Sequence, residues 1–182
     1  MKTSIGIIEF TSIASGIAAS DAMLKAADVT LLISRTICPG KFMTMISGDV
    51  AAVRSSIEAA EQLATSEVVD TFIVANIHPT IIPAIQGINI VDKIDALGII
   101  ESFSVASLVE AADQAVKTAK VQILELRLAM AIGGKGFVTL CGEVAAVTSA
   151  VNTGAGFISQ KGLLVNKVVI PHPRAEILKE YL

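Results

Sequence analysis

The residues of this chain that could do chemistry are few and widely spaced. Glu9 and Glu101 both end short apolar stretches, and an acid–base pair of carboxylates would have to lie within about 5–10 Å. They fall in different copies of the repeat described below, so we interpret both as structural. His78 and His172 have no serine or cysteine nucleophile beside them in a recognisable motif. The sequence therefore predicts no enzyme active site.

The two cysteines, Cys38 and Cys141, lie far apart and lack the spacing of metal ligands. We expect two reduced thiols and no disulfide. Cys141 lies within a predicted strand and reads as a small buried apolar residue. Gly133 and Gly134 complete neither a dinucleotide-binding nor a phosphate-loop motif.

The composition limits the possible partners. Of the 182 residues, 53% are hydrophobic and 17% are charged, which predicts an obligate oligomer that buries apolar surface between subunits. Polar residues, glycine or proline interrupt every apolar run before the roughly 18 residues of a membrane span. The net charge of −3 without a basic cluster argues against nucleic acid as a partner. The first residues do not resemble a secretory signal, so we expect a cytoplasmic protein without a membrane partner.

The chain repeats itself. Gly-Ile-Ile-Glu of residues 6–9 recurs at residues 98–101, an offset of 92 positions. After the glycine-containing turns the offset is 94, because residues 48–53, Gly-Asp-Val-Ala-Ala-Val, match residues 142–147. We extend this offset to the repeat ends, where His78-Pro79 matches His172-Pro173. These matches predict two homologous domains, residues 1–91 and 92–182.

Each repeat has the pattern of a small α+β domain. In the first repeat, residues 4–10, 29–37, 42–46 and 68–75 are predicted strands, and residues 12–27 and 50–64 are predicted helices. Residues 38–41 form a turn, and residues 78–85 form a short closing helix. The order β-α-β-β-α-β is that of a ferredoxin-like fold.

Four motifs of the repeats resemble the bacterial microcompartment shell domain. They are Gly-Ile-Ile-Glu at the start, Asp-x-x-x-Lys-x-Ala-x-Val at the end of the first helix, Gly-Asp-Val-Ala-Ala-Val at the second helix, and His-Pro near the end. The resemblance covers the chain twice, and neither copy looks circularly permuted. The chain is most similar to tandem shell proteins of the propanediol-utilisation type. In that family two fused domains trimerise, and six domains surround an opening in a hexagonal tile that packs edge to edge.

The resemblance implies that two turns line the opening. The expected pore-lining residues are Cys38, Pro39, Gly40, Lys41, Ile132, Gly133, Gly134, Lys135 and Gly136. Small residues allow six loops to approach an axis, and the lysines Lys41 and Lys135 would favour anions there. The alternative is that both segments are ordinary hairpin turns.

The resemblance also implies a set of residues at the tile edge. These are Lys25, Lys117, His78, His172 and Arg174. In the family the helix-end lysine donates to backbone carbonyls of the neighbouring tile. The alternative is that Lys25 and Lys117 are solvated and interact with their own helix dipoles, and that His78 is an exposed residue after a strand.

No bound cofactor is expected. The propanediol-type relative is thought to hold an iron–sulfur cluster through a cysteine of its second pore loop, and the matching residue here is Gly136. Cys38 in the first turn would be presented three times around the axis, which leaves a cluster at Cys38 as the alternative.

The predicted function is that of a structural shell component of a bacterial microcompartment. Its expected partners are two further copies in a homotrimer, other microcompartment shell proteins, and small metabolites that cross the pore. Two rival hypotheses remain at this point. One is an electron conduit through Cys38, and the other is a soluble ferredoxin-like regulator that binds a small ligand.

Overall fold

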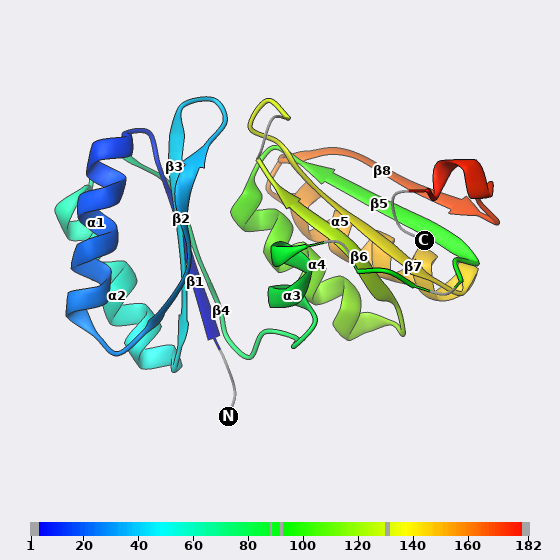
Figure 1. Cartoon of the computed structure of the whole chain (residues 1–182), viewed down its shortest axis with the longest axis horizontal. Helices are drawn as coiled ribbons and strands as arrows, with labels where there is room; N and C mark the ends of the chain where they lie inside the picture. Colours follow the sequence, from blue (N-terminus) through cyan, green and yellow to red (C-terminus); the bar gives the residue numbers. More distant parts are fainter. Residues whose placement is uncertain (1–3, 88, 92, 130–131, 180–182) are drawn as a thin grey trace. The chain divides into compact units, whose positions relative to one another are not determined.

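The structure is a computed structural model that describes residues 4–87, 89–91, 93–129 and 132–179. By its internal contacts the chain divides into two units, Met1–Ile77 and His78–Leu182 (Figure 1). Residues 78–87 and 89–91, which we grouped with the first repeat from the sequence, therefore pack with the second unit. Within the described residues, no helix is long and apolar enough to cross a membrane.

The first unit is a four-stranded antiparallel sheet with two helices on one face (Figure 1). The strand order is β2-β3-β1-β4, so β2 and β4 are the edge strands. The elements, in chain order, are β1 (Ser4–Phe10), α1 (Ile13–Ala26), β2 (Thr30–Ile37), β3 (Lys41–Gly48), α2 (Val50–Leu63) and β4 (Val68–Val74).

The second unit repeats this plan after a short leading helix. Its strand order is β6-β7-β5-β8, which is the order of the first sheet with matching strands. The elements are α3 (Ile81–Gln86), β5 (Ala96–Ser102), α4 (Val105–Thr118), β6 (Gln122–Leu128), β7 (Gly136–Gly142), α5 (Val144–Gln160), β8 (Leu164–Pro171) and the short η1 (Ala175–Ile177). The predicted β-α-β-β-α-β order and the α+β class are confirmed in both units.

The first helix of each unit begins with the same cap. The Ser12 hydroxyl accepts a hydrogen bond from the Ser15 N–H, and the Ser104 hydroxyl accepts one from the Ser107 N–H, both at 3.2 Å. Such a cap satisfies one backbone donor that the first helical turn leaves free. The core of the first unit lies between its sheet and helices, where Ile8, Phe10, Met23 and Val53 are among the fully buried members.

One contact between sheet and helix occurs at equivalent positions in the two cores, but the sizes of its two residues are reversed. In the first unit the Phe42 ring lies against Gly16 of α1, where an added Cβ would come within 2.6 Å of the ring. The matching pair in the second unit is Gly136 of β7 and Leu108 of α4, and a Cβ on Gly136 would come within 2.7 Å of Leu108. A large strand residue meets glycine on the helix in one unit, and the sizes are reversed in the other.

The strand register corrects one expectation from the sequence. Glu9 pairs with Asp70 and Glu101 pairs with Asn166, so β4 and β8 match at an offset of 96 positions instead of 94. Two further residues are gained before β8, because α5 is three residues longer than α2 and the connection after it is one residue shorter.

At this offset His78 corresponds to Arg174, and Asn76 corresponds to His172. The backbone agrees, because Asn76 and His172 both have positive φ, 56° and 48°. The expected match of His78-Pro79 to His172-Pro173 is therefore wrong.

Candidate functional site

The two turns expected to line a pore are tight glycine turns at equivalent places. Cys38, Pro39 and Gly40 connect β2 to β3, and Ile132 to Lys135 precede β7. Gly40 and Gly134 have φ of 78° and 82°, a left-handed conformation that residues with a Cβ rarely adopt. Residues 130 and 131 of the second turn lie outside the described residues.

Gly136, which was expected to line the pore, is buried and does not belong to the second turn. It is the first residue of β7 and faces α4, so a side chain at this position would point toward Leu108. The remaining expected turn residues are half-buried or exposed, except Gly134, which is buried.

Each turn ends in a lysine that forms an ion pair with the glutamate at the end of the first strand. The Lys41 Nζ lies 2.6 Å from the Glu9 Oε2, and the Lys135 Nζ lies 2.5 Å from the Glu101 Oε1. Ile8 and Phe10 join the core between sheet and helices, so strand alternation directs Glu9 to the opposite face. The glutamates thus offset the positive charge that the lysines were expected to bring to the turns.

The two pairs differ in burial. The Glu9 side chain is 1% exposed and Lys41 is 19% exposed, whereas Glu101 and Lys135 are 29% and 36% exposed. The Glu9 Oε1 is buried and makes no hydrogen bond within the described part of the chain. The same ion pair is therefore largely shielded from water in the first unit and partly exposed to water in the second.

The cysteines do not form a ligand set within one chain. Cys38 is half-buried in the β2–β3 turn, and Cys141 is buried in β7, where desolvation raises the pKa of its thiol. Among the described residues no group of three or more His, Cys, Asp or Glu side chains could hold a metal ion. An iron–sulfur cluster is usually held by four cysteine thiolates, and a single chain brings only one thiol to this turn.

The helix-end lysines occupy equivalent positions in unlike surroundings. Lys25 pairs with Asp21 one helical turn earlier, and their side chains are 74% and 62% exposed. Lys117 pairs with Asp113 in the same way, at 2.5 Å, but Asp113 is only 1% exposed. The Asp113 Oδ1 also accepts a hydrogen bond of 2.7 Å from the backbone N–H of His78.

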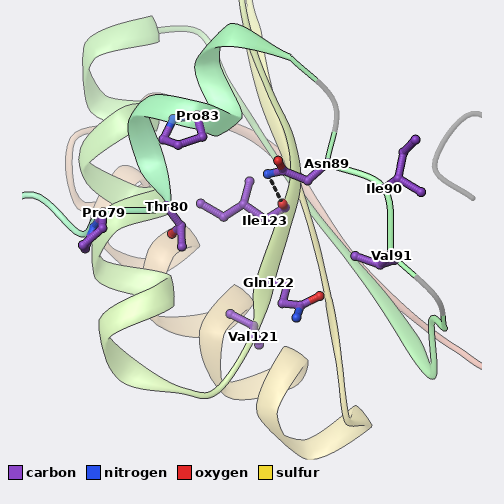
Figure 2. A pocket seen from close by; sticks show the side chains of 9 residues that line it. All are labelled: Pro79, Thr80, Pro83, Asn89, Ile90, Val91, Val121, Gln122 and Ile123. Carbon is purple, nitrogen blue, oxygen red and sulfur yellow. Dashed lines mark hydrogen bonds between the residues drawn. The ribbon is translucent and has the colours of Figure 1, made fainter.

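The segment after the first unit, residues 78–87 and 89–91, lies on the edge of the second sheet; we call it the segment after the first repeat. The Asn89 N–H donates to the Leu124 carbonyl at 2.7 Å, and the Asn89 Nδ2 donates to the Ile123 carbonyl at 2.8 Å. Both carbonyls belong to β6, the edge strand. This segment and the start of β6 line an open pocket of about 410 Å³. Figure 2 shows its lining residues, Pro79, Thr80, Pro83, Asn89, Ile90, Val91, Val121, Gln122 and Ile123.

The remaining tile-edge candidates follow the last strand of each unit: His78 follows β4, and His172 and Arg174 follow β8. The His172 N–H donates to the Asp95 carbonyl at 2.8 Å, and its side chain is exposed. The Arg174 guanidinium lies 3.1 Å from the Glu176 carboxylate, and this hydrogen bond holds the pKa of Glu176 below its usual value. The His78 Nδ1 lies 2.8 Å from the Thr80 hydroxyl.

Sequence reasoning missed three residues of this region. Asp113 and Asn89 make the contacts that fix the segment after the first repeat, and Asp21 is the exposed counterpart of Asp113. The only signal in the sequence was the recurrence of Asp21 as Asp113 at the repeat offset.

Comparison with known proteins identifies the family. The BMC domain matches residues 4–77 and again residues 96–173. The bacterial microcompartment shell protein PduT of Citrobacter freundii is 46% identical over 180 residues, which cover 99% of this chain and 98% of PduT. The shell protein EutM of Salmonella typhimurium is 38% identical over 85 residues, which cover 46% of this chain and 84% of EutM.

A solved structure agrees over nearly the whole chain. The crystal structure of a microcompartment protein from Desulfitobacterium hafniense DCB is 51% identical, with a TM-score of 0.91, and the match covers 97% of this chain and 98% of that protein. The chain therefore belongs to the BMC domain family and contains two copies of the domain.

Proposed function

We propose that this protein is a structural component of a microcompartment shell and that three copies form a ring of six domains around a central opening. The observation that supports this proposal most directly is that one chain contains two BMC domains with the same strand order. A relative such as EutM matches about half of this chain, so three tandem chains supply as many domains as six single ones. The protein is a shell component and not an enzyme.

The turns of both units would line the opening. Gly40 and Gly134 let the chain reverse close to an axis without a side chain in the way. Because Glu9 and Glu101 pair with the turn lysines, the rim carries no large excess of positive charge. This arrangement suits the passage of small polar metabolites by size, with little preference for anions.

The mass of the assembly in solution tests the ring. Native mass spectrometry should give a species of three times 18.9 kDa over a wide concentration range. A protein that stays monomeric at every concentration would contradict the ring and favour a soluble ligand-binding regulator.

Edge-to-edge packing of the rings is tested through the helix-end lysines. We expect the wild type to form flat sheets or tubes in electron microscopy at high concentration. Lys25→Ala with Lys117→Ala should abolish these sheets and leave the trimer intact. Lys167→Ala, at an exposed lysine of β8, is the matched control and should still form sheets. Sheets that persist in the double variant would remove these lysines from the edge.

We infer that the ring holds no iron–sulfur cluster. The residue that matches the cluster ligand of the propanediol-type relative is Gly136, and a side chain at this position would point toward Leu108 of α4. Anaerobic purification followed by iron and sulfide analysis should give iron-free protein. Iron and sulfide that disappear in Cys38→Ser would instead support an electron conduit.

A further inference from the structure

The segment after the first repeat shows how a repeat end binds to a neighbouring BMC domain. Its His78 N–H donates to the buried Asp113 of α4, and its Asn89 donates twice to the β6 edge. Helix α3 packs against β6, where Ile81 is fully buried and Ile123 is 2% exposed. A repeat end therefore covers the first helix and the edge strand of the domain that follows it in the chain.

The corresponding residues of the first unit are uncovered. Ile123 matches Leu31 of β2, which is 41% exposed, and Asp113 matches Asp21, whose side chain is 62% exposed. The apolar residues of α1 show the same difference from those of α4. Ile13, Ile17 and Leu24 are 41%, 56% and 43% exposed, and their counterparts Val105, Val109 and Val116 are 0%, 0% and 9% exposed.

The end of the second repeat has a residue equivalent to Ile81, and this residue is exposed. By the strand register Ile177 is the counterpart of Ile81, and it is 58% exposed. The adjacent Leu178 is 4% exposed and packs with Leu97, Leu124 and Cys141 of its own unit. Leu178 thus anchors the segment and leaves Ile177 free to contact another molecule.

We propose that residues 174–179 of one copy dock on α1 and β2 of a second copy, with Ile177 against Leu31 and the Arg174 backbone N–H directed to Asp21. This inference rests on the proposed ring and names the contact that closes it. In a closed ring of six equivalent positions, α1 and β2 of each first unit face the end of a second repeat of another copy, as α4 and β6 face the end of a first repeat within one chain. The occupant is a second copy, since the segment that fits is the counterpart of one already seated on α4 and β6.

The first test compares Ile177→Asp with Leu63→Asp. Leu63, at the end of α2, is also 58% exposed, and its counterpart Phe157 on α5 is half-buried with the Lys161 ammonium over its ring, so Leu63 is an equally exposed residue outside the proposed contact. Placing a carboxylate where an isoleucine becomes buried should weaken association by about tenfold or more at each contact. Three equal contacts multiply to about 1000-fold for the trimer.

Native mass spectrometry over a dilution series measures the concentration of half-dissociation, and circular dichroism checks that both variants fold. We expect Leu63→Asp to match the wild type and Ile177→Asp to yield monomers. If the wild type is trimeric and Ile177→Asp assembles equally well, the docking proposal is wrong and the ring stands. If the wild type is itself monomeric, the ring proposal fails first.

Cross-linking tests the pair directly. In a Cys38→Ser, Cys141→Ser background, Leu31→Cys with Ile177→Cys should react with a short bis-maleimide to give covalent dimers and trimers on a denaturing gel. The control, Leu63→Cys with Ile177→Cys, should stay monomeric on the gel. Trimeric protein whose Leu31→Cys, Ile177→Cys variant gives only single chains would exclude the proposed contact.

Discussion

Substitution of the two strand-end glutamates should have unequal costs, although both form the same ion pair. Glu9→Gln leaves the Lys41 ammonium without its counter-charge in a site where the glutamate is 1% and the lysine 19% exposed. Loss of one member of a buried pair costs about 3–5 kcal/mol, and the residual contact of Lys41 with water reduces this to about 2–4 kcal/mol. Glu101→Gln leaves Lys135, which is 36% exposed, able to find water, and should cost under about 1 kcal/mol after solvent screening.

Thermal unfolding at one fixed protein concentration measures the difference. For a chain of this length about 1 kcal/mol corresponds to about 2–4 °C in Tm, so Glu9→Gln should lower Tm by on the order of 10 °C and Glu101→Gln by under about 4 °C. Adding 1 M salt should change the Glu101 effect more than the Glu9 effect, because exposed charges are screened more strongly. Equal losses of Tm in the two variants would refute the argument that burial sets the strength of these pairs.

Three further outcomes follow from the contacts described above. Gly16→Leu should destabilise the protein by about 1–3 kcal/mol through overpacking, and Phe42→Gly by about 3–5 kcal/mol through the cavity that it leaves. The double variant should recover most of the loss. Additive losses of unfolding free energy in urea would contradict this. Asp113→Asn weakens the hold on the segment after the first repeat, so hydrogen exchange in residues 78–87 should accelerate about tenfold, and unchanged exchange would show that the carboxylate does not secure it. Because burial raises the pKa of the Cys141 thiol, a thiol reagent at pH 8 should modify Cys38 quickly and Cys141 slowly, and equal rates measured by mass spectrometry would refute this order.

Much of the fold could be predicted because the apolar residues recur with strand and helix periods and the turns contain glycine. The change of offset at β8 could not, since the helix before it lengthens without any break in its pattern of small and apolar residues. The identical His-Pro dipeptides favoured a wrong alignment, and the strand pairings of Glu9 with Asp70 and of Glu101 with Asn166 revealed the right one.

The candidate site was predicted in part. The turns were identified from Gly40 and Gly134, but the ion pairs of their lysines needed the register in which Phe10 lies opposite Phe42. Glu9 and Lys41 are 32 residues apart, and no local pattern links them. The contact between His78 and Asp113 depends on how a connecting segment packs, which a sequence pattern does not record.

The reversed sizes of the Gly16–Phe42 and Leu108–Gly136 pairs also affect whether a helix of one unit can pack on the sheet of the other. If α1 settled on the second sheet, Gly16 would face Gly136 and leave a void the size of a large side chain. If α4 settled on the first sheet, Leu108 would collide with Phe42. Each helix therefore fits only the sheet of its own half, and this mismatch disfavours swapped assembly between halves that otherwise share their topology.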